Sequence, residues 1–172
     1  LIIAMYHPLF SNGNTAGFFS LRQHIFPFTD MHPAAYVPLP IVGSLYPLYH
    51  GAGATRQDLD NSLYYELKEE ILTICEDYTN LVFVSGKEQN MQYFYEDDNH
   101  FVNSGSMTGN DYARRGGEAE FAYQARGFSK LIYYANGELW LEFWEVIDKE
   151  GNGQVAFRTK LAHEKPQLIY QN

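Results

Sequence analysis

An amphipathic helix followed at once by a short apolar strand is the feature that most limits how this chain can fold. Within residues 58–78, apolar side chains recur at intervals of three or four, at Leu59, Leu63, Leu67, Ile71, Ile74, Cys75 and Tyr78. That spacing predicts one apolar face of an α-helix, and Asp58 is a suitable N-cap. The uninterrupted apolar run at 81–85 predicts a buried strand that ends at Gly86. A helix leading into a buried strand indicates an αβ unit with some parallel pairing.

The first residues of the chain carry a second apolar run. Residues 1–5 predict another buried strand, which continues into a turn at 6–8 and a polar loop at 11–14. A short helix is expected from Ser20. Because the run lacks an initiator Met, a basic segment and a cleavage site, we expect neither a signal peptide nor a natural start here, and we expect the chain to be a portion of a longer protein.

The segment 29–56 is apolar but broken by proline. Its four prolines alternate with aliphatic and tyrosine residues, which makes it too apolar for disorder and too interrupted for a helix or a central strand. We predict a long ordered loop that packs on another domain or a membrane-associated subunit. The alternative is a loop folded back over its own sheet. The candidate partner contacts are Tyr36, Leu39, Ile41, Tyr46 and Tyr49.

Beyond Gly86 the pattern favours antiparallel hairpins. Strands are expected at 91–95, 101–104, 121–125, 129–134, 138–146 and 154–161, with a Gly-rich, mobile loop at 105–118. Asn136-Gly137 between two alternating runs is the strongest hairpin signal. Residues 164–172 are expected to form a tail. The fold class predicted from these elements is α/β, in the form of an α+β sandwich.

Charge and composition exclude several classes of protein. The formal net charge is −9, from 21 acidic and 12 basic residues, and no Lys/Arg stripe is present. Nucleic acid is therefore not expected as a partner. The single cysteine, Cys75, excludes an internal disulfide and a Cys-based zinc site. No stretch of this sequence has the ~20 apolar residues that a transmembrane helix needs.

Two segments at predicted strand ends could carry chemistry. Residues 5–13 read Met-Tyr-His-Pro-Leu-Phe-Ser-Asn-Gly, and residues 84–93 read Val-Ser-Gly-Lys-Glu-Gln-Asn-Met-Gln-Tyr. Each places a sharp turn and a polar cluster after a strand, where α/β proteins build their sites. Neither segment contains a pair of carboxylates at a spacing typical of a catalytic site, a His-x-His motif or a Ser/His/Asp combination.

These two segments resemble the last two motifs of the calcineurin-like metallophosphoesterases, a family that includes the purple acid phosphatases. In that family the first motif is a strand ending in His-x-Pro, and the second is Ser-Gly-His-x-His-Asn-Leu-Gln-Tyr. The motif histidines ligate a pair of divalent metals (Fe, Zn or Mn), which activate a bridging water. The resemblance implies a two-sheet sandwich flanked by helices, of which residues 1–163 would be the C-terminal part.

This chain keeps the residues that surround the metal ligands in the two motifs, but it does not keep the ligands themselves. Tyr6, Lys87 and Gln89 stand at the ligand positions, while His7, Gly86, Glu88, Asn90 and Gln92 keep the surrounding pattern. No catalytic residue, metal ligand or cofactor is therefore expected. One hypothesis places the Lys87 ammonium where a metal would lie, among remaining carboxylates. The alternative is an exposed lysine in a relaxed loop. For Tyr6, a phenol filling the vacant ligand space is favoured over a general acid or a phosphate contact.

A narrower resemblance concerns residues 11–14, 21–48 and 121–131. They are similar to metallophosphoesterase domains of the Bacteroidetes, some of which precede an Omp85-type (BamA-like) outer-membrane barrel. This implies a periplasmic or outer-membrane-associated place in the cell envelope and a barrel assembly as partner.

Three functions follow as expectations. The first is a pseudoenzyme, a non-catalytic scaffold or interaction module in a larger protein or complex. The second is an active metal-dependent phosphoesterase, a hydrolase completed by a missing N-terminal half. The third is a remnant that another chain completes.

Overall fold

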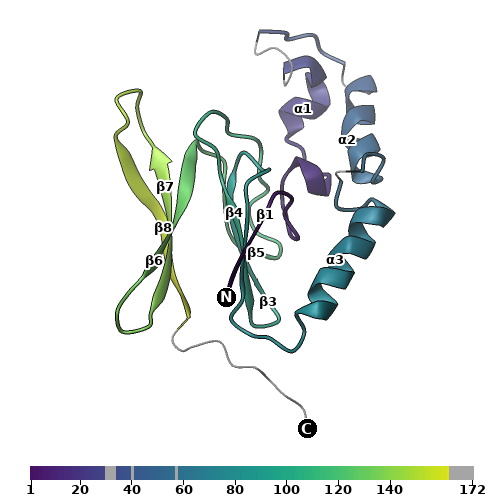
Figure 1. Ribbon diagram of the computed structural model, residues 1–172. Helices are drawn as coiled ribbons and strands as arrows, with labels where there is room; N and C mark the ends of the chain where they lie inside the picture. Colours follow the sequence, from purple (N-terminus) through teal and green to yellow (C-terminus); the bar gives the residue numbers. More distant parts are fainter. Residues whose placement is uncertain (30–33, 40, 57, 163–172) are drawn as a thin grey trace.

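The computed structural model describes residues 1–29, 34–39, 41–56 and 58–162, and the predicted tail at 164–172 lies outside the described residues. Figure 1 shows the chain in three layers: a three-stranded sheet, a five-stranded sheet, and helices along the outer face of the larger sheet. The architecture is thus an α+β sandwich, as the pattern of elements predicted.

The five-stranded sheet combines parallel and antiparallel pairing. Its strand order is β1-β2-β4-β3-β5. The β1–β2 and β2–β4 pairs are parallel, and β3 is antiparallel to both β4 and β5. This confirms both the parallel pairing expected for the apolar strands and the hairpin expected after Gly86. The bounds are β1 Ile2–Met5, β2 Val82–Ser85, β3 Met91–Glu96, β4 Asn99–Ser104 and β5 Ala119–Tyr123.

The smaller sheet is an antiparallel meander of β6 (Gly127–Tyr133), β7 (Leu139–Val146) and β8 (Gly153–Ala162). The β6–β7 hairpin predicted at Asn136-Gly137 is confirmed. Gly137 has φ 90°, and its N–H donates to the Tyr134 carbonyl at 3.0 Å. Glycine adopts this left-handed conformation without the steric penalty that a side chain would bring.

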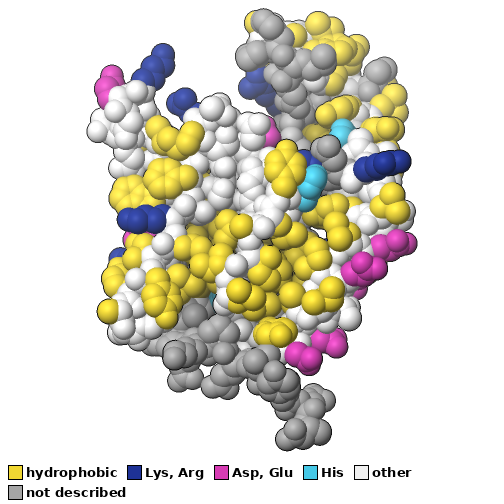
Figure 2. Space-filling view, viewed as in Figure 1, with side chains coloured by type: hydrophobic (Ala, Val, Ile, Leu, Met, Phe, Trp, Pro, Cys, Tyr) yellow, Lys and Arg dark blue, Asp and Glu magenta, His cyan; other side chains and the backbone are white. Residues whose placement is uncertain are grey.

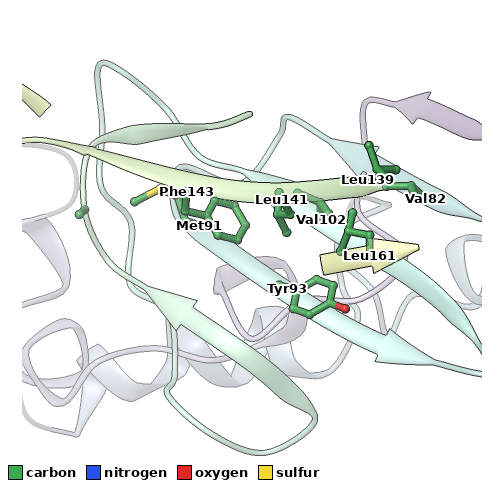
Figure 3. Packing of buried hydrophobic residues seen from close by; sticks show 9 residues of the cluster. Val82, Met91, Tyr93, Val102, Leu139, Leu141, Phe143 and Leu161 are labelled. Carbon is green, nitrogen blue, oxygen red and sulfur yellow. The ribbon is translucent and has the colours of Figure 1, made fainter. Parts of the chain in front are cut away.

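Alternation along the central strands builds two hydrophobic cores. Val82 and Val102 face the small sheet and pack with Leu141 and Phe143 of β7 (Figure 3). Their neighbours face the other way and pack against Ile71, Leu72 and Cys75 at the end of α3; they are Leu81, Phe83, Phe94 and Phe101. The central strands are therefore buried on both faces, which explains their continuous apolar sequences.

The helical layer contains three α-helices and three short 3₁₀ turns within the described residues. Ser20 caps α1 with a reciprocal capping box to Gln23. None of the helices in the described part of the chain is long and apolar enough to cross a membrane. The bounds are η1 Asn14–Ala16, α1 Leu21–Ile25, η2 Pro27–Thr29, η3 Val42–Ser44, α2 Leu45–Gly51 and α3 Ser62–Ile74.

Three expectations about these elements are wrong. The segment 29–56 is not a continuous loop, because η3 and α2 form within it. Pro47 is compatible with α2 because it occupies the first turn, where backbone N–H groups have no intrahelical acceptor. The long helix begins at Ser62 rather than 58, with Asn61 as its N-cap, and Asp58 is buried elsewhere. The strand at 1–5 is not buried: within the part of the chain that the structure describes, β1 pairs with β2 alone, at the edge of the sheet, and Ile2 is exposed.

Candidate functional site

The two motif-bearing loops meet at one end of the five-stranded sheet. Because β1 and β2 are parallel neighbours, their carboxyl ends lie together. The Lys87 backbone N–H donates to the Tyr6 carbonyl at 3.1 Å and joins the loops where they leave the strands. The polar segments 5–13 and 84–93, which the sequence suggested as a site, therefore do form one cluster.

Glu88 is the central acceptor of this cluster. Its side chain is buried, and its Oε1 accepts hydrogen bonds from the Ser11 hydroxyl (2.8 Å) and the Thr15 hydroxyl. Its Oε2 accepts from the Asn90 amide at 3.4 Å. The carboxylate thus holds together the two loops and η1, with every donor supplied by this chain.

Asn90 and Gln92 extend the network and are fully buried. The Gln92 Oε1 accepts from the Asn12 backbone N–H at 2.6 Å, and its amide donates to Asn90 Oδ1 at 2.5 Å. Both residues belong to the retained motif pattern, and their role here is to satisfy buried backbone and side-chain groups.

The Gly-rich loop 105–118 is bonded to the same network. Asn90 donates to the Tyr112 carbonyl at 3.1 Å, and the Arg114 N–H donates to the Asn12 carbonyl at 2.9 Å. The Asn12 amide also reaches the Gly116 carbonyl at 2.7 Å. The loop that the sequence suggested to be mobile therefore forms one wall of the site.

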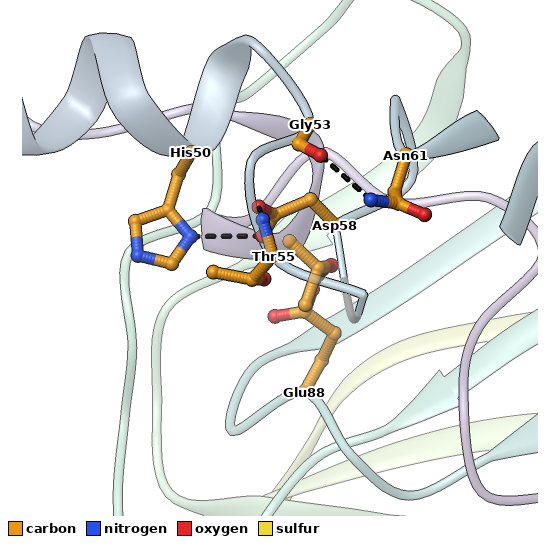
Figure 4. Close-up of polar contacts among 7 residues, drawn as sticks. His50, Gly53, Thr55, Asp58, Asn61 and Glu88 are labelled. Atoms are coloured by element: carbon orange, nitrogen blue, oxygen red, sulfur yellow. Dashed lines mark hydrogen bonds and ion pairs between the residues drawn. The ribbon is translucent and has the colours of Figure 1, made fainter. Parts of the chain in front are cut away.

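A cavity of about 200 Å³ opens beside Glu88. On its far side the His50 Nδ1 lies 2.8 Å from the Asp58 Oδ1, and the Thr55 N–H donates to Asp58 Oδ2 at 2.8 Å. Figure 4 shows the Glu88 side chain pointing toward this group from the β2–β3 loop. The lining residues are Asn14, Thr15, Phe19, Tyr46, His50, Thr55, Asp58, Lys87, Glu88 and Asp111.

Lys87 lines this cavity and is partly buried. Burial lowers the pKa of its ammonium, while the carboxylates of Glu88 and Asp58 act in the opposite direction and favour the charged form. The pKa of His7 is lowered as well, by burial first and then by the charge of Lys87. A cation and two carboxylates thus share the space at the end of β2.

Tyr6 and Gln89, the other two residues at positions that the resemblance assigns to metal ligands, do not line the cavity. The Tyr6 side chain is 67% exposed and packs edge-on against His7. It therefore does not fill a buried ligand space, contrary to expectation. Gln89 is exposed, and its carbonyl accepts the Asp111 N–H at 3.0 Å. Gly86 is exposed too.

The predicted partner contacts belong to the segment that contains η3 and α2, and one of them, Tyr46, also lines the cavity. Four of them, Tyr36, Ile41, Tyr46 and Tyr49, have exposed side chains. Leu39 is partly buried, and its N–H donates to the Ile25 carbonyl at 2.8 Å. Tyr46 and Tyr49 belong to α2, and the Leu39 backbone bonds to the last residue of α1, so the described part of this segment packs on α1 and forms α2.

Sequence reasoning missed half of the cavity. The His50–Asp58 pair comes from the end of α2 and the turn before α3, and no motif spacing links the two residues. Asp111 lies in a loop whose only sequence signal was its glycine content. Among the described residues, no group of three or more His, Cys, Asp or Glu side chains converges so that it could hold a metal ion.

Comparisons with known proteins add little to this geometry. No protein-family model matches the chain, and no curated protein matches it. Among solved structures, the chain is similar to GAP50, the anchor in the inner membrane complex of Plasmodium, with 24% identity and a TM-score of 0.43. The match covers 64% of this chain and 33% of that one, and a likeness of this extent identifies neither fold nor function.

Proposed function

We propose that this chain is part of a metallophosphoesterase-like domain that has lost its metal chemistry and works as a non-catalytic interaction module in a larger protein or complex. The observation that carries the proposal is the placement of Lys87 beside Asp58 and Glu88 at the end of β2. A cationic side chain there supplies the positive charge that neighbouring carboxylates need.

The donor set at this position does not fit a two-metal centre. A protonated lysine has no lone pair to offer a metal, and its charge repels a divalent cation. The Glu88 carboxylate already accepts three hydrogen bonds from this chain. The Asp58 carboxylate is similarly engaged by His50 and the Thr55 N–H. No hydrolytic step is therefore assigned to these residues.

Exposed apolar surface supports an interaction role. Figure 2 shows hydrophobic side chains gathered between β1 and α3, with others beside α2. On the first surface, no described strand pairs with the outer edge of β1, and Ile2 is exposed beside it. The solvent side of α3 adds Leu63, Tyr65, Leu67 and Ile74. Surfaces of this kind mark contacts with other domains or subunits.

An envelope location, close to an outer-membrane barrel, belongs to the same proposal. It is supported only by the sequence resemblance to domains fused to such barrels. A neighbouring domain or subunit would cover β1 and α3 in that setting.

The decisive test is the metal content of the full-length protein. After incubation with iron, zinc or manganese salts and gel filtration, elemental analysis should detect no stoichiometric metal. Phosphomonoesterase and phosphodiesterase assays should give the rate of a buffer blank. Stoichiometric metal together with hydrolysis of either substrate class would overturn the proposal in favour of the active phosphoesterase.

The interaction role has its own test. A photo-crosslinking amino acid at Leu67 of the full-length protein should capture another domain or subunit in cells. The same group at Glu150, in the exposed β7–β8 turn, is the matched control. Equal labelling at both positions, or none at Leu67, would contradict an interface at α3.

A further inference from the structure

The charge of the chain is divided unevenly along the sequence. Residues 1–57 contain one of the 21 acidic residues and two of the 12 basic residues. The single acid, Asp30, lies outside the described residues. Every other carboxylate of the strongly acidic chain follows residue 57. The first third of the sequence is therefore close to neutral, while the remainder has a large negative charge.

The uncharged part includes the helical lobe, defined as residues 21–29, 34–39 and 41–51, which contains α1, η2, η3 and α2. Figure 1 shows α1 and α2 beside each other at one end of the molecule, extending past the sheets. The Leu39 N–H bond to Ile25 and the Arg22–Tyr36 bond (2.8 Å) hold the lobe together. Because of this position, the lobe would reach a flat surface before the two sheets, which belong mostly to the acidic part of the chain.

The lobe directs apolar side chains outward. On α2 the exposed side chains are Leu45, Tyr46, Leu48 and Tyr49, and Pro47 is the one that is buried. Successive residues of a helix are ~100° apart around its axis. The four exposed side chains therefore cover a broader face than the apolar stripe that a surface helix usually turns toward its core. Tyr36, Val37 and Ile41 extend the same surface, and the Ile41 side chain is 85% exposed.

The surroundings of this surface differ from those of α3. On α3, exposed Leu63 and Leu67 alternate with charged residues, among them Glu66 and Glu69, as at the polar rim of a protein–protein interface. On the lobe, by contrast, the sequence between Arg22 and Arg56 has no Lys or Arg and a single acid. In the described residues of the lobe, aliphatic and tyrosine side chains lie with one exposed arginine, Arg22, and no carboxylate, which matches the headgroup layer of a bilayer.

We propose that the helical lobe rests in the interfacial layer of a lipid bilayer, with Ile41, Leu45 and Leu48 among the acyl chains and Tyr36 and Tyr49 at headgroup level. In this orientation the acidic sandwich points away from anionic headgroups, and the exposed Arg22, which bonds to Tyr36, is placed to meet them. The inference rests on the proposed interaction role and names the partner of one surface, without depending on the loss of metal chemistry.

Vesicle cosedimentation of the full chain tests this inference. The probe is a vesicle of phosphatidylcholine mixed with phosphatidylglycerol. The I41D/L48D variant should bind about tenfold more weakly than the unaltered chain, because aspartate is strongly disfavoured in the apolar layer. Both side chains project into solvent, Leu48 with 64% exposure, so the variant should keep the circular dichroism spectrum of the unaltered chain.

The matched control is L63D/L67D, which places the same charges on exposed leucines of α3 (59% and 48% exposed). It should bind vesicles as the unaltered chain does. Equal loss in both variants, or no vesicle binding by the unaltered chain, would overturn the inference. The inference would also be overturned, in favour of a protein interface, if the unaltered chain bound no lipid and the I41D/L48D variant lost a protein partner. Stoichiometric metal in a vesicle-binding protein would overturn the proposed function alone.

Discussion

The Ser11 hydroxyl donates a 2.8 Å hydrogen bond to the Glu88 carboxylate, joining residues that are 77 positions apart in the sequence. Both side chains are buried. The bond ties the loop after β1 to the loop after β2, at the place where the family resemblance would put metal ligands. The Glu88 carboxylate accepts hydrogen bonds on both of its oxygens and so holds the two loops together.

Glu88→Gln should destabilise the fold by about 1–3 kcal/mol, the usual cost of an unsatisfied buried polar group. Both carboxylate oxygens accept hydrogen bonds from side chains of this chain. An amide replaces one acceptor with a donor, which then faces another donor. Urea unfolding followed by circular dichroism measures the difference. The matched change at exposed Glu150, Glu150→Gln, should stay within about 0.5 kcal/mol, and equal values for the two variants would contradict the role of Glu88.

Gly13→Ala should destabilise the fold through a steric clash with the same carboxylate. A Cβ at Gly13 would lie 2.6 Å from the Glu88 Oε2 and 3.0 Å from the Asn90 amide nitrogen. The backbone of Gly13 is extended, so strain in φ is not the cause. Overpacking of this kind costs about 1–3 kcal/mol.

Gly86→Ala is the control for this substitution. A Cβ at Gly86 meets nothing within 4 Å, so the variant should unfold at the midpoint of the unaltered chain or slightly above it. The two variants can be compared in one thermal melt. If Gly86→Ala were as unstable as Gly13→Ala, the loss of stability would come from replacing any glycine in these loops and not from the clash with Glu88.

Much of the sandwich could be predicted from local pattern. The strands at 81–85, 91–95 and 101–104 were predicted from the sequence, and the turn at Asn136-Gly137 fixed one hairpin. The meeting of the two motif loops followed from parallel pairing of β1 with β2. Each of these depends on residues that are near in sequence or on a general rule of sheet geometry.

The features that were not predicted from the sequence depend on contacts between residues that are far apart in the chain. An apolar strand at a sheet edge has the same composition as a central one, so the exposure of Ile2 could not be read from residues 1–5. Glu88 was noted only as a motif neighbour, because its donors Ser11 and Thr15 lie more than 70 positions away. The His50–Asp58 pair required the path of α2, which the prolines concealed.

Asn61→Ala should destabilise α3 by about 1 kcal/mol, the usual value for a lost N-cap. The Asn61 side chain accepts the Leu63 N–H at 3.2 Å and donates to the Gly53 carbonyl at 2.8 Å. Glu66→Ala, at an exposed position within α3, should change stability by only a few tenths of a kcal/mol. Unfolding midpoints of the two variants check the assignment, and a neutral Asn61→Ala would show that α3 begins elsewhere.

His100 should make stability depend on pH between about 4 and 6.5. Burial lowers its pKa from 6.5 to about 4, and its Nδ1 lies 2.9 Å from the Tyr93 hydroxyl. The folded state therefore holds the neutral ring, while the unfolded chain binds a proton more readily. The contribution of this group is fully present above pH 6.5, falls as the pH drops toward 4, and amounts to a few kcal/mol.

Replacing His100 with Gln removes this titration while keeping a polar group for Tyr93. Urea unfolding at a series of pH values should show that the stability of the unaltered chain falls more steeply below pH 6.5 than that of His100→Gln. All other titrating groups are common to both proteins, so the difference between the two curves isolates the buried imidazole. Parallel curves across this range would mean that His100 takes up its proton as easily in the fold as in the unfolded chain.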